Sequence, residues 1–213
     1  MLLTRLRAET AELHAAVERR LGVMDPHLTP AGYADTLAAF HGFHAAWEPA
    51  VRTAAAASPV GPAVLDLMAS RWRLPALAAD LAHLGLDPAA VAPATADDGT
   101  PAVPRLDPPG RLLGSLYVME GSTLGGVLVA RHLERTLGLA GGVGYAYFCG
   151  HGDQAGPRWR AFAARLTELA ASLPPGGDDD AVAGAADTFR ALDGWLARPR
   201  AAVGVREEAG GRG

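Results

Sequence analysis

The chain has 213 residues, of which 49% are hydrophobic and 20% are charged, a composition that is typical of a folded globular domain and excludes a wholly disordered chain. Its 19 basic and 23 acidic residues give a net charge of −4. Proteins that bind nucleic acids usually carry an excess of basic residues, so we expect no nucleic-acid partner. Lysine, asparagine and isoleucine are absent, so a function that elsewhere uses lysine must use arginine here.

The chain contains a single cysteine, Cys149, which excludes an intramolecular disulfide and any zinc or iron–sulfur site with several cysteines. We interpret this residue as an inert, small hydrophobic side chain. The first segment, MLLTRLRAETAELH (1–14), is charged within five residues and lacks the apolar core of a signal peptide. We therefore expect a cytoplasmic protein.

Almost the whole chain has the periodicity of amphipathic helices. Thr29 and Pro30 suit an N-cap followed by proline at the first helical position. The proline-rich stretch 92–110 indicates a long surface connection. With no alternating strand pattern, the sequence predicts one all-α domain, a multi-helix bundle over residues 1–200, followed by a disordered tail over 201–213. The expected helices cover residues 2–20, 31–57, 62–72, 75–84, 111–137, 157–173 and 178–199.

Three glycines, Gly121, Gly125 and Gly126, interrupt the expected helix over 111–137. Each costs about 1 kcal/mol relative to alanine, so some other interaction must compensate. A flat ligand against bare backbone and close packing on a neighbouring helix both explain them. A third explanation is a membrane-spanning helix with a G-x-x-x-G dimer face. Glu120 near its middle argues against that, and we expect no membrane partner.

The expected helix over 2–20 carries a candidate metal ligand. His14 borders its apolar face, and Glu18 follows four residues later on the same face, where it can accept the Nδ1 proton and leave Nε2 free for a metal. Arg7, seven residues earlier, shares that face at a distance of about 10 Å. This pattern suits a heme ligand, its orienting acid and a cation for a propionate. The alternative is a partly buried histidine with a solvated ion-pair partner.

Three segments together resemble the heme oxygenases. LRAETAELHAAVE (6–18) is similar to their proximal helix and YVMEGSTLGG (117–126) to their glycine-rich distal helix. YFCGHGDQAGPRWRAF (147–162) resembles the bacterial branch that makes biliverdin for bacteriophytochromes. The resemblance implies a bundle that holds heme between a proximal and a glycine-kinked distal helix.

The reaction that the resemblance implies is oxidative cleavage of heme to biliverdin, ferrous iron and carbon monoxide. It uses dioxygen and electrons from an external donor such as ferredoxin or a reductase. Heme is both cofactor and substrate, and a bacteriophytochrome is the implied acceptor of the bilin.

The resemblance also implies roles for single residues on the proximal side. His14 corresponds to the axial ligand of the heme iron and Glu18 to its hydrogen-bond partner. Arg7 and Tyr117 correspond to residues that contact the heme propionates. The helix over 157–173 offers three further candidates for a propionate contact: Arg158, Arg160 and Arg165.

On the distal side, Gly121, Gly125 and Gly126 correspond to the stretch whose backbone approaches the heme. Ser122 stands where several heme oxygenases have an aspartate that anchors a water network. Its hydroxyl can hold a water molecule but carries no charge, so we expect a different arrangement for proton delivery.

The remaining histidines have simpler interpretations. His41 and His44 have the spacing of a metal-binding pair but no third ligand nearby, so we interpret them as packing or surface residues. We expect His132 to be solvated and His151 to lie in a loop.

Two alternative functions remain. A heme carrier or sensor would bind heme through His14 on the same fold without degrading it. A di-iron enzyme of related fold would require repeated Glu-x-x-His pairs, and the sequence has none.

Overall fold

The computed structural model describes residues 1–90 and 103–198, and regular structure within those ranges is entirely helical. This confirms the all-α prediction for the described residues. The expected tail over 201–213, and most of the expected connection over 92–110, lie outside them. The helices are α1 (Leu2–Glu9), α2 (Ala11–Leu21), α3 (Pro30–Ala56), α4 (Gly61–Met68), α5 (Leu74–His83), η1 (Pro88–Ala90), α6 (Pro109–Gly121), η2 (Ser122–Gly125), α7 (Gly126–Leu137), α8 (Ala146–Cys149), η3 (Gly152–Gln154), α9 (Ala155–Ala171) and α10 (Gly177–Ala197).

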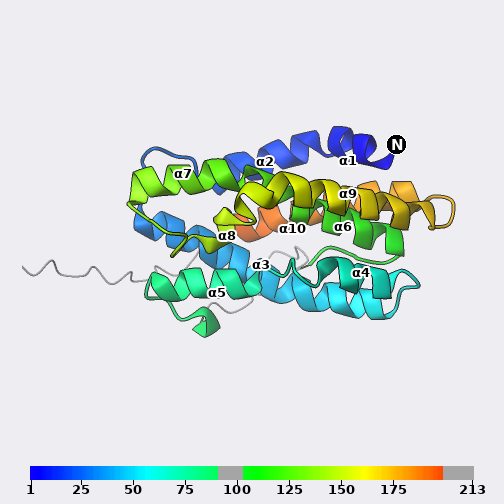
Figure 1. Ribbon diagram of the computed structural model, residues 1–213, viewed down its shortest axis with the longest axis horizontal. Coiled ribbons are helices and arrows are strands. Elements are labelled where there is room, and N and C mark those ends of the chain that lie inside the picture. Colours follow the sequence, from blue (N-terminus) through cyan, green and yellow to red (C-terminus); the bar gives the residue numbers. More distant parts are fainter. Residues whose placement is uncertain (91–102, 199–213) are drawn as a thin grey trace, which may run out of the picture.

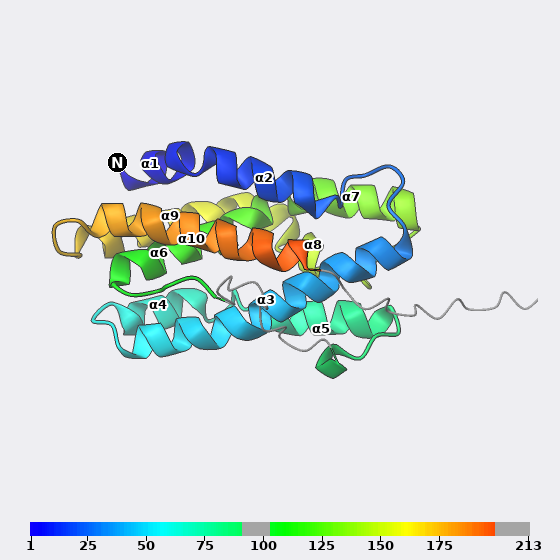
Figure 2. The same cartoon turned by 180° about the vertical axis from the view of Figure 1, so that it is seen from behind.

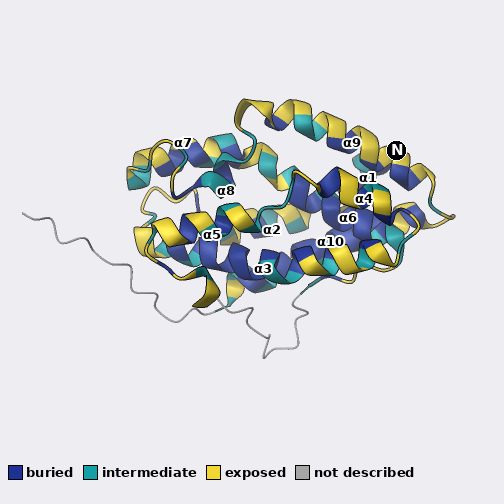
Figure 3. Ribbon diagram, turned by 60° about the horizontal axis from the view of Figure 1, so that its bottom comes forward, coloured by how far each residue is buried: buried dark blue, intermediate teal, exposed yellow. Residues whose placement is uncertain are grey.

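The long helices lie roughly parallel to one another (Figures 1 and 2). In both views α3, α4 and α5 occupy one side of the bundle, α1 and α2 run along the opposite side, and α6 and α10 lie between them. Figure 3 shows that burial is concentrated on α6, α10 and the inward face of α3, whereas α9 has an exposed outer face. The core therefore follows the α6–α10 pair.

Glycines allow α6 and α10 to pack with their backbones in contact. A Cβ atom added at Gly114 would lie 1.8 Å from the Ala181 carbonyl oxygen, and one at Gly184 would lie 2.2 Å from the Arg111 carbonyl oxygen. No side chain fits in either place. The close-packing explanation for glycine in this segment therefore holds at Gly114, about two turns before the first of the three glycines that the sequence singles out.

A buried polar contact fixes α3 against the same pair of helices. The Trp47 indole donates to the Ser115 hydroxyl at 2.9 Å, and the Thr188 hydroxyl lies 2.8 Å from the same oxygen. All three residues are almost completely buried. Because unpaired polar groups are costly in a core, these bonds favour one register of α3, α6 and α10.

The expected single helix over 2–20 is wrong in one respect, because the structure divides it at Thr10. The Thr10 backbone has φ −111° and ψ 6°, and its hydroxyl donates to the Leu6 carbonyl oxygen at 2.7 Å. Such a bond from a threonine to the preceding turn bends a helix. The backbone bond from His14 to Thr10 continues across the bend at 2.9 Å, so α1 and α2 form one bent rod.

The run Pro109–Leu137 is long and apolar enough to cross a membrane by length and composition, with a mean hydropathy of 1.4 over its most apolar window. Half of that window is buried inside the protein. Packing in the bundle thus accounts for much of its apolar composition. The Glu120 carboxylate in its middle is buried and accepts a hydrogen bond from Arg71 Nε at 3.1 Å.

We expect Gly114→Ala and Gly184→Ala each to lower the free energy of unfolding by about 1–3 kcal/mol or more, because each new methyl group would meet backbone atoms that cannot move alone. Urea denaturation followed by far-UV circular dichroism measures this change. Gly156→Ala in α9 is the matched control, since its Cβ would meet nothing within 4 Å. Equal stability of all three variants would contradict the close-packing argument.

Candidate heme-binding site

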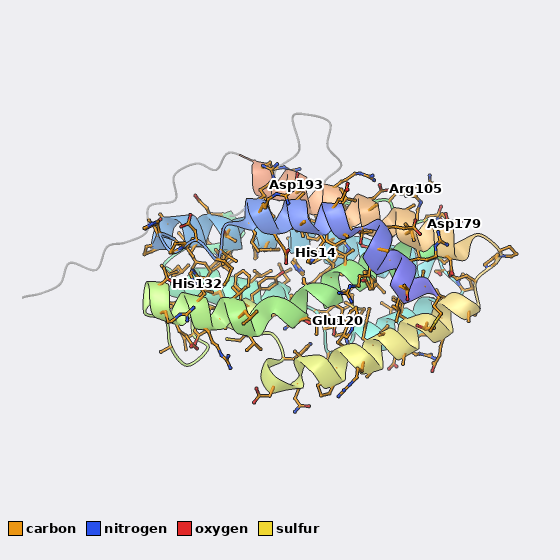
Figure 4. All side chains as sticks on the ribbon, turned by 90° about the horizontal axis from the view of Figure 1, so that it is seen from above. His14, Arg105, Glu120, His132, Asp179 and Asp193 are labelled. Carbon is orange, nitrogen blue, oxygen red and sulfur yellow. The ribbon has the colours of Figure 1, made fainter. Side chains whose placement is uncertain are left out.

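A cavity of about 670 Å³ lies between α2 and the run α6–η2–α7. Phe40, Tyr147, Trp159 and Phe189 close it from α3, α8, α9 and α10. Its volume is that of a small-molecule site, and its walls are mainly apolar. Figure 4 labels His14 in the strip between α2 and α6–α7, and Glu120 on the side of α6 that faces α9.

His14 lines the cavity from α2, and 53% of its side chain remains exposed. Its ring makes an edge contact with Phe189, with the ring centroids 5.6 Å apart. Glu18 also lines the cavity, with its Oε2 atom 3.6 Å from His14 Nδ1. That distance is within ion-pair range but longer than a hydrogen bond. The expected ligand and its expected acid are therefore neighbours on one wall.

One end of this cavity is suited to anionic groups. Arg7 lines it from α1 and Tyr117 from α6. Burial raises the pKa of the Tyr117 phenol, and the positive charge of Arg7 acts on the same pKa in the opposite direction. The Tyr117 ring in turn packs on Trp159 at a centroid distance of 5.6 Å. The bend at Thr10 thus leaves Arg7 and His14 on the same wall, as the sequence predicts.

The three singled-out glycines fall into two groups. A Cβ atom at Gly125 would meet nothing within 4 Å, and one at Gly121 would meet only the Trp159 ring at 3.6 Å, an ordinary contact. Both line the cavity, so helix packing does not explain them. Gly126 differs, because its Cβ would lie 2.2 Å from the Phe148 carbonyl oxygen. Packing against α8 therefore explains Gly126, whose backbone also lines the cavity.

The helix tightens to 3₁₀ geometry between these glycines, over Ser122–Gly125. The Ser122 hydroxyl donates to the Met119 carbonyl oxygen at 2.7 Å, and the Thr123 hydroxyl donates to the Glu120 carbonyl oxygen at 2.7 Å. A hydroxyl that donates its proton in this way still has lone pairs to accept from a water molecule. Ser122 lines the cavity and can hold water there as an acceptor.

A chain of buried polar side chains, Glu48, His44 and Tyr147, reaches the cavity from α3, and the sequence pattern did not predict it. Glu48 Oε1 lies 3.2 Å from His44 Nδ1, and His44 Nε2 lies 3.4 Å from the Tyr147 hydroxyl. Burial would raise the pKa of Glu48, but hydrogen bonds from His44 and from two backbone N–H groups hold it below its ordinary value. Burial also lowers the pKa of His44. At neutral pH Glu48 is therefore ionised and His44 is neutral.

The protonation states fix the direction of these hydrogen bonds. A carboxylate only accepts, so Nδ1 of His44 carries the proton and donates to Glu48. Nε2 of the neutral ring is then an acceptor, and the Tyr147 hydroxyl donates to it. His44 and Tyr147 both line the cavity. The repeated His-x-x-x-Glu spacing, at 14–18 and again at 44–48, is the one sequence signal that could have drawn attention to this chain.

Two buried carboxylates fix the positions of the cavity-lining residues Arg73 and Tyr147. Glu48 Oε1 accepts the backbone N–H groups of Arg73 and Leu74 at 2.8 and 2.9 Å, and so caps the start of α5. Asp80 accepts the N–H groups of Ala146 and Tyr147 at 2.8 Å each, and so caps the start of α8. Arg73 lines the cavity too, although no local sequence pattern indicates it.

The other candidate residues lie outside the cavity lining. His41 is buried, which agrees with packing. The expectation that His132 is solvated is wrong, because His132 is buried and its Nε2 lies 3.0 Å from the Asp25 carbonyl oxygen. The loop before α3 covers it. His151 lies in the turn before η3, as expected, and Cys149 is free and partly buried.

None of the three arginines expected on α9 lines this cavity. Arg158 donates to the Ser70 hydroxyl at 2.6 Å, Arg165 pairs with Glu168 at 2.8 Å, and Arg160 is exposed. The cationic residues in the cavity lining are instead Arg7 and Arg73.

The donor set fits a heme and not a multi-ligand metal ion. Within residues 1–90 and 103–198, no group of three or more histidine, cysteine, aspartate or glutamate side chains could hold a metal. His14 and Glu18 line an apolar cavity from α2, Gly121 and Gly125 line it from the facing run, and Arg7 lines it from α1. A flat, anionic metallocycle that takes one axial imidazole has this shape and charge.

The fold and the site therefore define an all-α protein with a mainly apolar cavity that His14 and bare glycine backbone line from facing helices. The sequence model of the heme oxygenase family matches residues 1–198, and the chain belongs to that family. A comparison with curated protein sequences gives no match.

Solved structures of heme oxygenases have the same fold. The NO- and CO-bound heme oxygenase of Neisseria meningitidis is 25% identical, with a TM-score of 0.70 over 92% of this chain and 90% of that one. The heme oxygenase of Leptospira interrogans is 21% identical, with a TM-score of 0.74 over 92% and 98% of the two chains. Heme oxygenase 2 of Chlamydomonas reinhardtii, solved without heme, is 22% identical, with a TM-score of 0.74 over 95% and 99%.

We expect Glu48→Leu to lower the free energy of unfolding by about 2–4 kcal/mol, because it leaves the N–H groups at the start of α5 unpaired in a buried place. Glu48→Gln keeps an acceptor oxygen at the same position and should cost clearly less. Urea denaturation at neutral pH compares the two variants. A loss in Glu48→Gln as large as that in Glu48→Leu would show that the charge, and not the cap, is what matters.

Proposed function

We propose that this protein is a catalytically active heme oxygenase. It cleaves heme oxidatively to biliverdin, ferrous iron and carbon monoxide, with dioxygen and with electrons from an external donor such as ferredoxin or a reductase. It works in the cytoplasm, and the bilin serves as a chromophore for an acceptor of the bacteriophytochrome class. Family membership and the likeness to the NO- and CO-bound heme oxygenase of Neisseria meningitidis support the heme chemistry.

One observation carries the proposal. Gly121 and Gly125 leave bare backbone on the cavity wall that faces His14, and no atom of residues 1–90 or 103–198 outside the neighbouring helix backbone lies within 4 Å of the Cβ position at Gly125. A glycine in a helical run lowers stability, and at Gly125 no packing contact with the described residues compensates for this loss. A planar ligand that lies against the backbone compensates for it.

The residues of the chain divide the work around the substrate. His14 ligates the iron, and Glu18 accepts the proton of Nδ1 and keeps Nε2 directed at the metal. Arg7 and Tyr117 hold the propionates. Bound heme supplies the redox chemistry and is itself the ring that is opened. Apolar walls exclude bulk water from it.

On the facing wall, Gly121, Gly125 and Gly126 let the backbone approach the ring and Ser122 accepts a hydrogen bond from water. The buried pair of Glu48 and His44 fixes the Tyr147 hydroxyl, which donates to His44 and can accept a hydrogen bond from water in the cavity. These three residues take the place of the aspartate that this protein lacks at position 122.

Heme titration of the purified protein, followed by ascorbate in air, tests the proposal. We expect a Soret band on binding, then its loss with growth of the broad red absorption of biliverdin. His14→Ala should abolish the change, because no second histidine reaches the same wall of the described cavity. His27→Ala, an exposed histidine outside the lining, should behave like the wild type. A stable Soret band under reductant and air would indicate a heme carrier or sensor instead.

Gly125→Ala separates a ligand-facing glycine from a packing glycine. We expect this variant to be as stable as the wild type, or more stable by up to about 1 kcal/mol, because the methyl group meets no protein atom and alanine favours the helix. The same methyl group should weaken heme binding or slow turnover several-fold. Thermal unfolding without heme and heme titration measure the two effects.

Gly126→Ala provides the opposite pattern, a loss of stability before any heme is added, because its Cβ would meet the Phe148 carbonyl oxygen. If Gly125→Ala binds and degrades heme like the wild type, the bare backbone at that position has no role in the site.

A further inference from the structure

A cluster of charged groups lies next to the ligand cavity, on the side of α6 that faces α9 (Figure 4). Arg71 and Arg73 come from the segment between α4 and α5, His151 from the turn after α8, and Arg158 from α9. Glu120 of α6 is the acidic member, with its Oε1 atom 3.1 Å from Arg71 Nε and 3.9 Å from His151 Nε2. Of the three arginines, Arg71 is the one that the structure pairs with Glu120.

Arg71, Glu120 and His151 are largely out of solvent, and Arg73 and Arg158 are half-buried. The Arg71 and His151 side chains are each 11% exposed, and the Glu120 side chain is 4% exposed. Arg71 uses its Nε for Glu120 and its Nη1 for the Leu67 carbonyl oxygen at 2.6 Å. Arg71 and Glu120 are therefore a satisfied pair, and the charges of Arg73 and Arg158 remain without a carboxylate of their own among the described residues.

Three nitrogen atoms of this cluster are buried and have no hydrogen-bond partner within the described part of the chain: Arg73 Nη2, Arg158 Nε and His151 Nε2. They come from three different segments. Arg158 is held in place by its other nitrogen, Nη2, on the Ser70 hydroxyl. The turn at Gly150 closes over Arg73, since a Cβ there would lie 3.4 Å from Arg73 Nη2.

The pKa shifts in the cluster agree with an excess of positive charge that no carboxylate of the described residues compensates. Burial, together with the positive charges of Arg73, Arg158 and Arg71, lowers the pKa of His151 to about 4. Burial also lowers the pKa of Arg73, in the same direction as its arginine neighbours. Buried charges in proteins are normally paired, so a cluster that keeps its histidine neutral and still has excess positive charge favours an anion.

We propose that Arg73, Arg158 and His151 form a binding site for one small inorganic anion, of the size of chloride or phosphate. The guanidinium donors supply the charge and His151 a neutral N–H. The site borders the ligand cavity, because Arg73 belongs to the lining of both. An anion that holds the Arg73 guanidinium would fix the position of this side chain beside the cavity. Binding of the anion to the heme-free protein does not depend on the proposed heme chemistry.

Heme-free protein provides the direct test. Thermal unfolding midpoints are measured while sodium gluconate, whose anion is much larger than chloride or phosphate, is replaced by sodium chloride at constant ionic strength, and in a second series by inorganic phosphate. We expect a saturable rise of the midpoint with at least one of the two anions. Isothermal titration should give one anion per chain.

Arg158→Gln should abolish the anion-dependent rise, whatever its effect on the midpoint in gluconate. Arg160→Gln, an exposed arginine on the same helix, should keep the rise in full. No difference between chloride, phosphate and gluconate, or an equal rise in Arg158→Gln, would overturn the proposal.

Heme-loaded protein distinguishes a free anion from a carboxylate of the bound ligand. We expect the midpoint still to rise with the anion, and the pH at which water bound to ferric heme deprotonates, read from the visible spectrum, to shift when chloride replaces gluconate. An anion effect that disappears once heme is bound would overturn the proposal and give the three donors to a heme propionate.

Discussion

The wall of the cavity depends on two buried carboxylates that cap helices from outside those helices. Glu48 of α3 binds the first N–H groups of α5, and Asp80 of α5 binds the first N–H groups of α8. A buried carboxylate is costly on its own, and two charge-assisted bonds to the positive end of a helix offset that cost. These bonds connect α3 to α5 and α5 to α8, and they place Arg73 and Tyr147 at the cavity. Neither position follows from the local sequence pattern.

The glycines of α6 and α7 complete the site by two different physical means. Gly114 brings α6 into backbone contact with α10 and anchors the helix in the core. Farther along, Gly121 and Gly125 have no such contact and leave the backbone open to the cavity. Gly126 then fixes the start of α7 against α8. A helix anchored on both sides of an open stretch keeps that stretch in place without filling it, which is what a wall for a flat ligand requires.

Local pattern was enough to predict the long helices, the shared face of Arg7 and His14, and the unusual glycines, but not the short helix α8 or the 3₁₀ turn at η2. Each of these follows from helical periodicity or from the conformational cost of one residue type. The bend at Thr10 was missed because a hydroxyl bond to the preceding turn leaves no trace in the apolar pattern. Arg73 and the burial of His132 were missed for another reason: both depend on segments distant in sequence, namely Glu48 for the first and the loop at Asp25 for the second.

The two His-x-x-x-Glu pairs show how burial decides what one motif can do. In the His14–Glu18 pair, 53% and 66% of the side chains are exposed and the closest atoms are 3.6 Å apart, so the imidazole is open to a ligand from the cavity. The His44–Glu48 pair is 2% and 3% exposed with its atoms 3.2 Å apart, and its remaining nitrogen is taken by Tyr147. The first arrangement suits coordination of a metal, which needs a free Nε2. The second suits the retention of a proton, because the carboxylate fixes the tautomer and the tyrosine hydroxyl extends the chain to the cavity. The same four-residue spacing thus gives one exposed pair and one buried pair, and the surrounding helices determine which kind of pair each becomes.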